Sequence, residues 1–238
     1  MPSKIKDVKR STAVILVIVV VLILDQWLKF YIKMNLEYGQ GFDILGLNWA
    51  KIHFVENAGM AFGFSFGEPY GKLLLSLFRI IMVGFLLYIL HNLIKAKESF
   101  GLLISFALII AGALGNIIDS VFYGMIFSET PKFHGGVAEF LPQEGGYSSF
   151  LHGKVVDMLY FPLIDTTVPE WFPFWAGERF EFFKPVFNIA DSAISTGVIS
   201  ILLFHRRLFK SSHTQQAAST GIPASVTETQ SVNLKEEE

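Results

Sequence analysis

The chain has 238 residues, of which 52% are hydrophobic and 17% charged, and its formal net charge is -2. Such an apolar, weakly charged composition is typical of a membrane protein rather than a soluble domain, and the short basic clusters do not indicate a nucleic-acid surface. The absence of cysteine excludes disulfides, thiolate nucleophiles and cysteine-based metal sites.

Four apolar stretches approach or exceed the roughly 20 residues that cross a hydrocarbon core of about 30 Å. They are residues 13–32, 73–93, 100–118 and 187–204. The first follows basic residues, as a signal peptide does, but it lacks a small-x-small cleavage site and is predicted to be retained. The chain is therefore predicted to be an α-helical integral membrane protein with four transmembrane helices.

Basic clusters predict the orientation of these helices. They precede the first helix, separate the second from the third at Lys95 and Lys97, and follow the fourth at residues 206–210. Because such clusters stay on the cytoplasmic side, both termini are expected in the cytoplasm. The long connections 33–72 and 119–186 then face the outside of the membrane.

The first outer connection has the composition of a small β-sheet. Residues 44–66 alternate apolar and polar residues in places, are rich in β-branched and aromatic residues, and are interrupted by Gly59 and Gly63. This pattern predicts strands with turns. The sheet is expected to be extracytoplasmic.

The second outer connection contains an aromatic segment, "EWFPFWAGERFEFF", at residues 170–183. Pro169 and Pro173 interrupt any spanning helix, and the tryptophans predict a segment lying in the outer headgroup layer. The alternative is a small core that includes Phe180, Phe182 and Phe183.

The C-terminal end differs from the membrane domain. Residues 1–210 are expected to form a four-helix membrane domain, whereas residues 211–238 are polar, rich in Ser, Thr and Gln, and acidic at the end. This composition predicts a disordered cytoplasmic tail.

Two helix ends carry the same pattern of amide and carboxylate. Asn116 and Asp119 end the third predicted helix, and Asn188 and Asp191 begin the fourth. Residues three apart share a helix face, so each helix can present an amide and a carboxylate together. By the predicted orientation of the helices, both pairs are expected at the outer membrane edge. Asn188 is either a helix cap, with Asp191 favoured by the dipole, or a site residue. Asp119 lies at a helix C-terminus, where the helix dipole disfavours a carboxylate, so it needs a partner. Its role is either structural hydrogen bonding or catalysis.

Two further aspartates have structural and functional interpretations. Asp25 precedes Lys29 by one helical turn, which favours a structural ion pair at the membrane edge. Asp157 is either an exposed turn residue or part of a site. Two aspartates held close together share one proton, so one can activate water while the other protonates the leaving nitrogen of an amide.

Five motifs together resemble those of the bacterial lipoprotein signal peptidases, also called signal peptidase II. They are "DQWLK" (25–29), "ENAGMAFG" (56–63), "GALGNIID" (112–119), "GKVVD" (153–157) and "FNIADSAI" (187–194). The resemblance implies a four-span aspartic endopeptidase of the bacterial inner membrane with its active site at the extracytoplasmic face. It implies cleavage of diacylglyceryl-modified prolipoproteins before the lipidated cysteine.

The resemblance also implies partners and residue roles. Membrane lipids and globomycin-type cyclic lipopeptide inhibitors are implied partners, with no cofactor and no metal. Matching the motifs gives Asp157 and Asp191 the catalytic roles. It gives substrate-binding or supporting roles to Asp25, Lys29, Asn57, Asn116, Asp119 and Asn188.

One position departs from the family pattern. Family members commonly have arginine directly after the aspartate of GNxID, where this chain has Ser120. Cationic support for Asp119 is then expected from elsewhere, and Arg79 in the second predicted helix is a candidate. The alternative is that Arg79 snorkels or pairs with a backbone carbonyl.

Three other functions fit the sequence less well. "GFSFG" at 63–67 matches the nucleophile-elbow pattern around Ser65, but an outer loop is not the required strand-turn-helix context. A zinc peptidase lacks an H-E-x-x-H pair among the six histidines. An ion-coupled transporter is disfavoured because four spans show no inverted repeat.

Overall fold

The computed structural model describes residues 2–58, 70–133, 135–162, 164–171, 175, 177–182 and 185–205. The chain divides into two compact units, Met1–Val198 and Ile199–Glu238. The first unit carries every element discussed below except the last residues of the helix Ile189–Phe204. Ser65 and the predicted tail at 211–238 lie outside the described residues.

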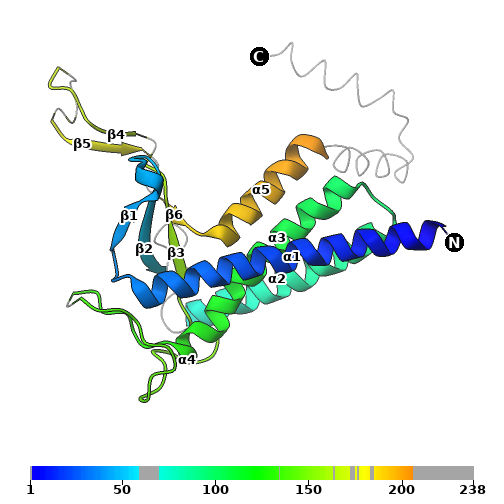
Figure 1. Ribbon diagram of the computed structural model, residues 1–238, viewed down its shortest axis with the longest axis horizontal. Helices are drawn as coiled ribbons and strands as arrows, with labels where there is room; N and C mark the ends of the chain where they lie inside the picture. The colour runs from blue at the N-terminus through cyan, green and yellow to red at the C-terminus, as the bar shows by residue number, and fades with distance from the viewer. Residues whose placement is uncertain are drawn as a thin grey trace, which may run out of the picture. The chain divides into compact units, whose positions relative to one another are not determined.

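Three long apolar helices lie side by side (Figure 1). They are α1 (Pro2–Asn35), α2 (Tyr70–Lys95) and α3 (Phe100–Ile118). The segments Lys9–Asn35, Gly71–Lys95 and Phe100–Ile126 are long and apolar enough to cross a membrane. Large apolar side chains such as Leu74 and Ile81 are exposed, as expected for helices that face lipid.

The fourth predicted span is a shorter helix. Helix α5 (Ile189–Phe204) is apolar and has 16 residues. The predicted start at Phe187 is two residues too early, because Val186 and Phe187 form strand β6 and Asn188 precedes the helix. The described residues therefore contain three helices of membrane-spanning length and one shorter apolar helix.

The third span does not end at Ile118. It continues through η2 (Asp119–Tyr123), a π-helical turn, into α4 (Gly124–Ile126). Asp119 thus lies inside a continuous helical segment, and the expected opposition from a helix C-terminus does not apply. Such π turns are frequent at functional sites.

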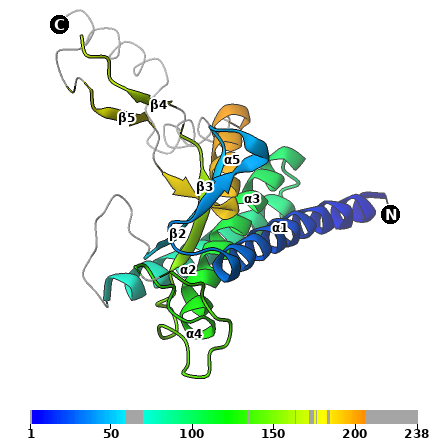
Figure 2. The same cartoon turned by 60° about the vertical axis from the view of Figure 1, so that its left-hand side comes forward.

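A four-stranded antiparallel sheet has the order β1-β2-β3-β6. Its strands are β1 (Gly41–Asp43), β2 (Lys51–Asn57), β3 (Val155–Tyr160) and β6 (Val186–Phe187), with the short helix η1 (Ile44–Gly46) after β1. The sheet predicted within 44–66 therefore begins earlier and takes two strands from the second connection. Figure 2 shows β2 beside β3. This pairing sets Asp157 opposite Val55.

The aromatic segment belongs to a separate two-stranded hairpin. Strand β4 (Ile164–Thr167) pairs with β5 (Arg179–Phe182). Between them, Trp171 is 79% exposed and Trp175 is 68% exposed. These two tryptophans are not packed in a small core. Phe183 and the side chains of Phe180 and Phe182 lie outside what the structure describes.

A buried ionic cluster near the C-terminal end of α1 was not predicted. Lys33 pairs with Glu56 of β2 and donates a hydrogen bond of 3.0 Å to Thr130. The Lys33 ammonium also lies over the rings of Phe127 and Tyr147, 5.3 and 5.2 Å from their centroids. A buried charge needs such partners. The cluster fixes β2 against α1 immediately before Asn57.

Candidate active site

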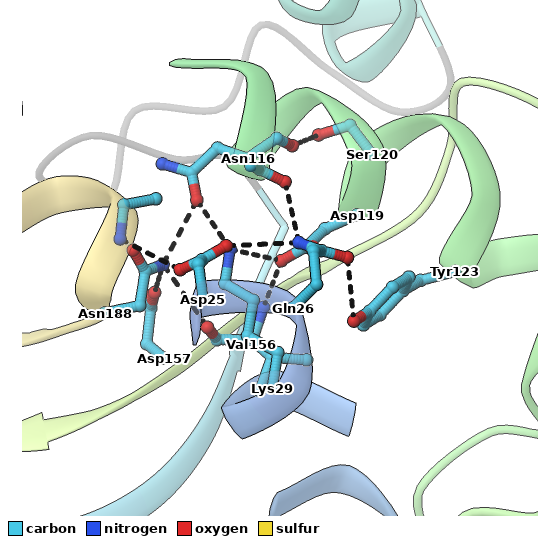
Figure 3. Close-up of polar contacts among 12 residues, drawn as sticks. Asp25, Gln26, Lys29, Asn116, Asp119, Ser120, Tyr123, Val156, Asp157 and Asn188 are labelled. Atoms are coloured by element: carbon cyan, nitrogen blue, oxygen red, sulfur yellow. Dashed lines mark hydrogen bonds and ion pairs between the residues drawn. The ribbon is translucent and has the colours of Figure 1, made fainter. Parts of the chain in front are cut away.

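One lysine of α1 joins two buried aspartates. Lys29 Nζ lies 3.0 Å from Asp25 Oδ2 and 2.8 Å from Asp119 Oδ2, and it donates a 2.9 Å hydrogen bond to Asn116 Oδ1 (Figure 3). The ion pair predicted between Asp25 and Lys29 is present, and both side chains are buried. The cation that contacts Asp119 is therefore Lys29 and not Arg79.

Gln26, inside the "DQWLK" motif, is a further hydrogen-bond donor to Asp119. Its Nε2 donates to Asp119 Oδ1 at 2.9 Å, while the Val156 amide donates to Asp119 Oδ2 at 3.2 Å. Tyr123 in turn donates to Gln26 Oε1 at 3.2 Å. The sequence analysis did not select Gln26. The sequence feature that could have identified it is the spacing of Gln26, Lys29 and Lys33, which places three polar residues on one face of an apolar helix.

Asn116 connects this buried cluster to Asp191. Its Nδ2 donates to Asp191 Oδ1 at 2.8 Å, and its Oδ1 accepts from both Lys29 and Asn188. The amide is thereby oriented by two donors on one side and one acceptor on the other. Asn116 consequently fixes the position of the Asp191 carboxylate.

Asn188 is both a helix cap and a site residue. Its Oδ1 accepts from the Asp191 amide at 2.9 Å, and its own amide donates to Asp191 Oδ2 at 3.4 Å, which is the reciprocal pattern of a capping box. Its Nδ2 also donates to Asp157 Oδ1 at 2.7 Å. The capping interpretation is correct, and the same side chain links the two aspartates.

Asp157 is buried in β3, so its interpretation as an exposed turn residue is wrong. Burial raises the pKa of its carboxyl to about 7, and the charge of Asp191 acts in the same direction. Hydrogen bonds from Asn188 and Asn57 oppose this rise. The Asp157 carboxyl therefore carries a proton over much of the range below neutral pH. Asp191, in contrast, is only half-buried.

Two glycines in α3 allow α5 and α1 to pack closely against it. A Cβ atom on Gly112 would lie 2.1 Å from the Ala190 carbonyl oxygen, and one on Gly115 would lie 2.6 Å from Asp25 Oδ2. Both contacts are too short for any other residue. The "GALGN" motif thus brings α5 and α1 against α3 next to Asn116.

Gly153 has the same role beside the π turn. Its Cβ would lie 2.1 Å from the Asp119 carbonyl oxygen, and its amide donates to the Ser120 carbonyl at 2.8 Å. The "GKVVD" segment therefore lies directly against η2. This contact sets the start of β3 and hence the position of Asp157.

The structure brings all eight predicted site residues into one connected group. Asp25, Lys29, Asn116, Asp119, Asp157, Asn188 and Asp191 share the contacts above, and Asn57 joins through Asp157. Arg79 reaches the edge of the group, where it donates to Ser120 Oγ at 3.2 Å. Two aspartates held by the same residue, Asn188, with one carboxyl buried and the other reachable from solvent, have the properties of an acid and a base.

Comparison with known proteins assigns the family. Residues 17–207 match the model of the family described as signal peptidase (SPase) II. The lipoprotein signal peptidase of Porphyromonas gingivalis is 47% identical over 208 residues, which cover 87% of this chain and 88% of that protein. The lipoprotein signal peptidase of Amoebophilus asiaticus is 38% identical, over 77% of this chain and 73% of that protein.

Solved structures share the fold. Two structures of a bacterial membrane enzyme, both determined by the in meso method, superpose with a TM-score of 0.51 and identities of 24% and 25%. They cover 84% and 81% of this chain and 90% and 91% of their own. The motif resemblance is thus confirmed, and the chain belongs to the signal peptidase II family, bacterial membrane peptidases of the aspartic class that act on lipoprotein precursors.

Proposed function

We propose that the protein is a membrane-embedded aspartic endopeptidase that removes signal peptides from diacylglyceryl-modified prolipoproteins by cutting before the lipidated cysteine. The observation that carries the proposal is that Asn188 contacts both carboxylates: its side-chain Nδ2 donates to Asp157 Oδ1 at 2.7 Å, and its backbone amide donates to Asp191 Oδ2 at 3.4 Å. Membership of the family supports the substrate class.

In the proposed mechanism, Asp191 is the base. It accepts hydrogen bonds from Asn116 and from the Asn188 amide, and it lies in the first turn of α5, where the dipole favours a negative charge. It takes a proton from a water molecule as the water oxygen bonds to the scissile carbonyl carbon. Its partial exposure gives that water access.

Asp157 is the proposed acid. Its carboxyl carries a proton near neutral pH because burial and the Asp191 charge both favour the neutral form. It stabilises the developing oxyanion and gives its proton to the leaving nitrogen as the carbon-nitrogen bond breaks. The products are a carboxylic acid and an amine, and no cofactor takes part.

The remaining site residues are proposed to support this pair. Asn57, Asn116 and Asn188 orient the two aspartates, and Asn57, which is the least buried of the three, is the amide proposed to reach the substrate. Asp25, Lys29 and Asp119 hold α1, α3 and β3 together through one buried ionic cluster. We place the protein in the bacterial inner membrane, with both termini cytoplasmic and the site at the extracytoplasmic face.

Cleavage is expected to depend on the lipid of the substrate. The two acyl chains each contribute about 0.8 kcal/mol per methylene that they bury, so the unlipidated prolipoprotein should be a poor substrate. Purified protein would be incubated with both forms at matched membrane concentration, and mass spectrometry would locate the cut. Equal rates for the two forms, or a cut elsewhere than before the lipidated cysteine, would contradict the proposed function.

The β4–β5 hairpin is proposed to lie in the outer headgroup layer. Trp171 and Trp175 are large, exposed and close in sequence, as in segments that anchor at a membrane interface. In a variant with Trp27 and Trp49 replaced by Phe, brominated lipids are expected to quench the fluorescence of this pair. Additional replacement of Trp171 and Trp175 by Phe supplies the background, and quenching no stronger than that of a water-exposed tryptophan would reject the placement.

A further inference from the structure

Arg79 lies on a polar face of a helix that is otherwise suited to lipid. It is in the segment Gly71–Lys95, and Lys72 and Ser76 precede it at helical spacing. Ser76 donates to the Leu151 carbonyl at 2.9 Å, Lys72 donates to the His152 carbonyl at 3.5 Å, and Arg79 donates to Ser120. This face therefore packs against the protein, and Arg79 donates to a side-chain hydroxyl within the protein rather than pairing with a backbone carbonyl.

The hydrogen-bond partner of Arg79 is neutral. Within the described parts of the chain, its guanidinium donates to the Ser120 hydroxyl at 3.2 Å and enters no ion pair. A guanidinium has five N–H donors, so this single bond leaves most of its capacity unused. A charge at membrane depth is costly and marks a functional position unless a carboxylate pairs with it.

Ser120 places this charge beside the aspartate pair. Its hydroxyl accepts from Arg79 and donates at 2.9 Å to the carbonyl of Asn116 (Figure 3). The side chain of the same Asn116 holds Asp191. Arg79 is therefore connected to the aspartate pair through two hydrogen-bonded residues, Ser120 and Asn116.

The charge balance of the site explains why a second cation is needed. The ionisable groups packed there are Asp25 and Lys29 of α1, Asp119 of η2, Asp157 of β3 and Asp191 of α5, with Arg79 of α2. With Asp25 and Asp119 both ionised, Lys29 leaves one net negative charge on them, and an Asp157–Asp191 pair that shares one proton adds another. Without Arg79, two like charges would remain in a poorly hydrated site, where they repel strongly.

We propose that Arg79 is a positioning residue for the reaction, whose guanidinium, anchored on Ser120, supplies the positive charge that keeps one aspartate of the Asp157–Asp191 pair ionised at neutral pH. The inference rests on the proposed function. Arg79 acts through the pair and does not itself exchange protons.

The test is the pH profile of cleavage. Loss of a nearby cation makes each carboxyl hold its proton more tightly, so both apparent pKa values of the pair rise. The acid limb needs an ionised base and the alkaline limb needs a protonated acid, so Arg79→Gln should move both limbs to higher pH by about one unit. Arg79→Lys keeps the charge and should leave the limbs in place. Ser76→Ala, on the same face of α2, is the matched neutral control.

The absence of cysteine allows the charge to be restored chemically. In Arg79→Cys, aminoethyl methanethiosulfonate adds a cation to the only thiol, whereas methyl methanethiosulfonate adds a neutral group of similar chemistry. The cationic adduct should move the limbs back toward their wild-type pH, and the neutral adduct should not. Both adducts are made from one folded preparation, and mass spectrometry measures the extent of labelling.

The outcomes separate this inference from the proposed function. A profile for Arg79→Gln that superposes on wild type, or identical profiles for the two adducts, overturns the role of Arg79. A lower rate without any shift of the limbs also overturns it, because that is the result of a purely structural residue. Wild-type protein that does not cleave a diacylglyceryl-modified prolipoprotein rejects the proposed function itself.

Discussion

Asp157→Asn and Asp191→Asn are each expected to slow cleavage of a diacylglyceryl-modified prolipoprotein by about 10³-fold or more while the protein stays folded. Each substitution removes one half of an acid-base pair and changes little in volume. Because the two groups act as a unit, the double variant should be little slower than either single variant. Single-turnover rates in detergent or nanodiscs, with thermal unfolding as the check of folding, measure both effects.

Two substitutions provide controls for this result. Asp43→Asn removes a carboxylate of the same sheet that is partly exposed and 3.8 Å from Lys51, so activity should be retained. Ser65→Ala should also retain activity, since the G-x-S-x-G match is not expected to supply a nucleophile. Normal turnover by Asp157→Asn or by Asp191→Asn would reject the proposed pair.

The helices were predictable because their signal is local. A bilayer requires about 20 apolar residues in succession, and α1, α2 and α3 each contain such a run. The cap at Asn188 was predictable for the same reason, since capping involves residues three apart. The π turn at Asp119–Tyr123 has no such local signal. Gly153, thirty or more residues away in the sequence, packs directly against this turn.

The site was predicted as a set of residues but not as a geometry. Motif matching selected Asp157 without indicating that it lies in a strand, because β3 pairs with β2 across about 100 residues. The partner of Asp119 was also missed. In the sequence, Lys29 and Asp25 have the spacing of a helical ion pair, which leaves no sign of a further partner for the lysine. Only the packing of α1 on α3 shows that Lys29 also pairs with Asp119.

Lys29→Met is expected to lower the free energy of unfolding by about 3–5 kcal/mol, the usual result of removing one member of a buried ionic group. The substitution leaves Asp25 and Asp119 buried without their cation, although Gln26 and two backbone amides still donate to them. Reversible unfolding in detergent micelles measures the loss. Lys51→Met, which removes the exposed pair with Asp43, should cost no more than about 1 kcal/mol.

A second substitution shows whether the loss comes from uncompensated charge. Adding Asp119→Asn to Lys29→Met removes one of the two unpaired carboxylates, while an asparagine oxygen can still accept from Gln26 or Val156. The double variant should therefore be more stable than Lys29→Met alone, although neither residue of the original pair remains. Equal or lower stability would mean that Lys29 acts through packing of its side chain. In that case the buried cluster would hold the helices by shape, and the positions of Asn116 and Asp191 would not depend on its charge.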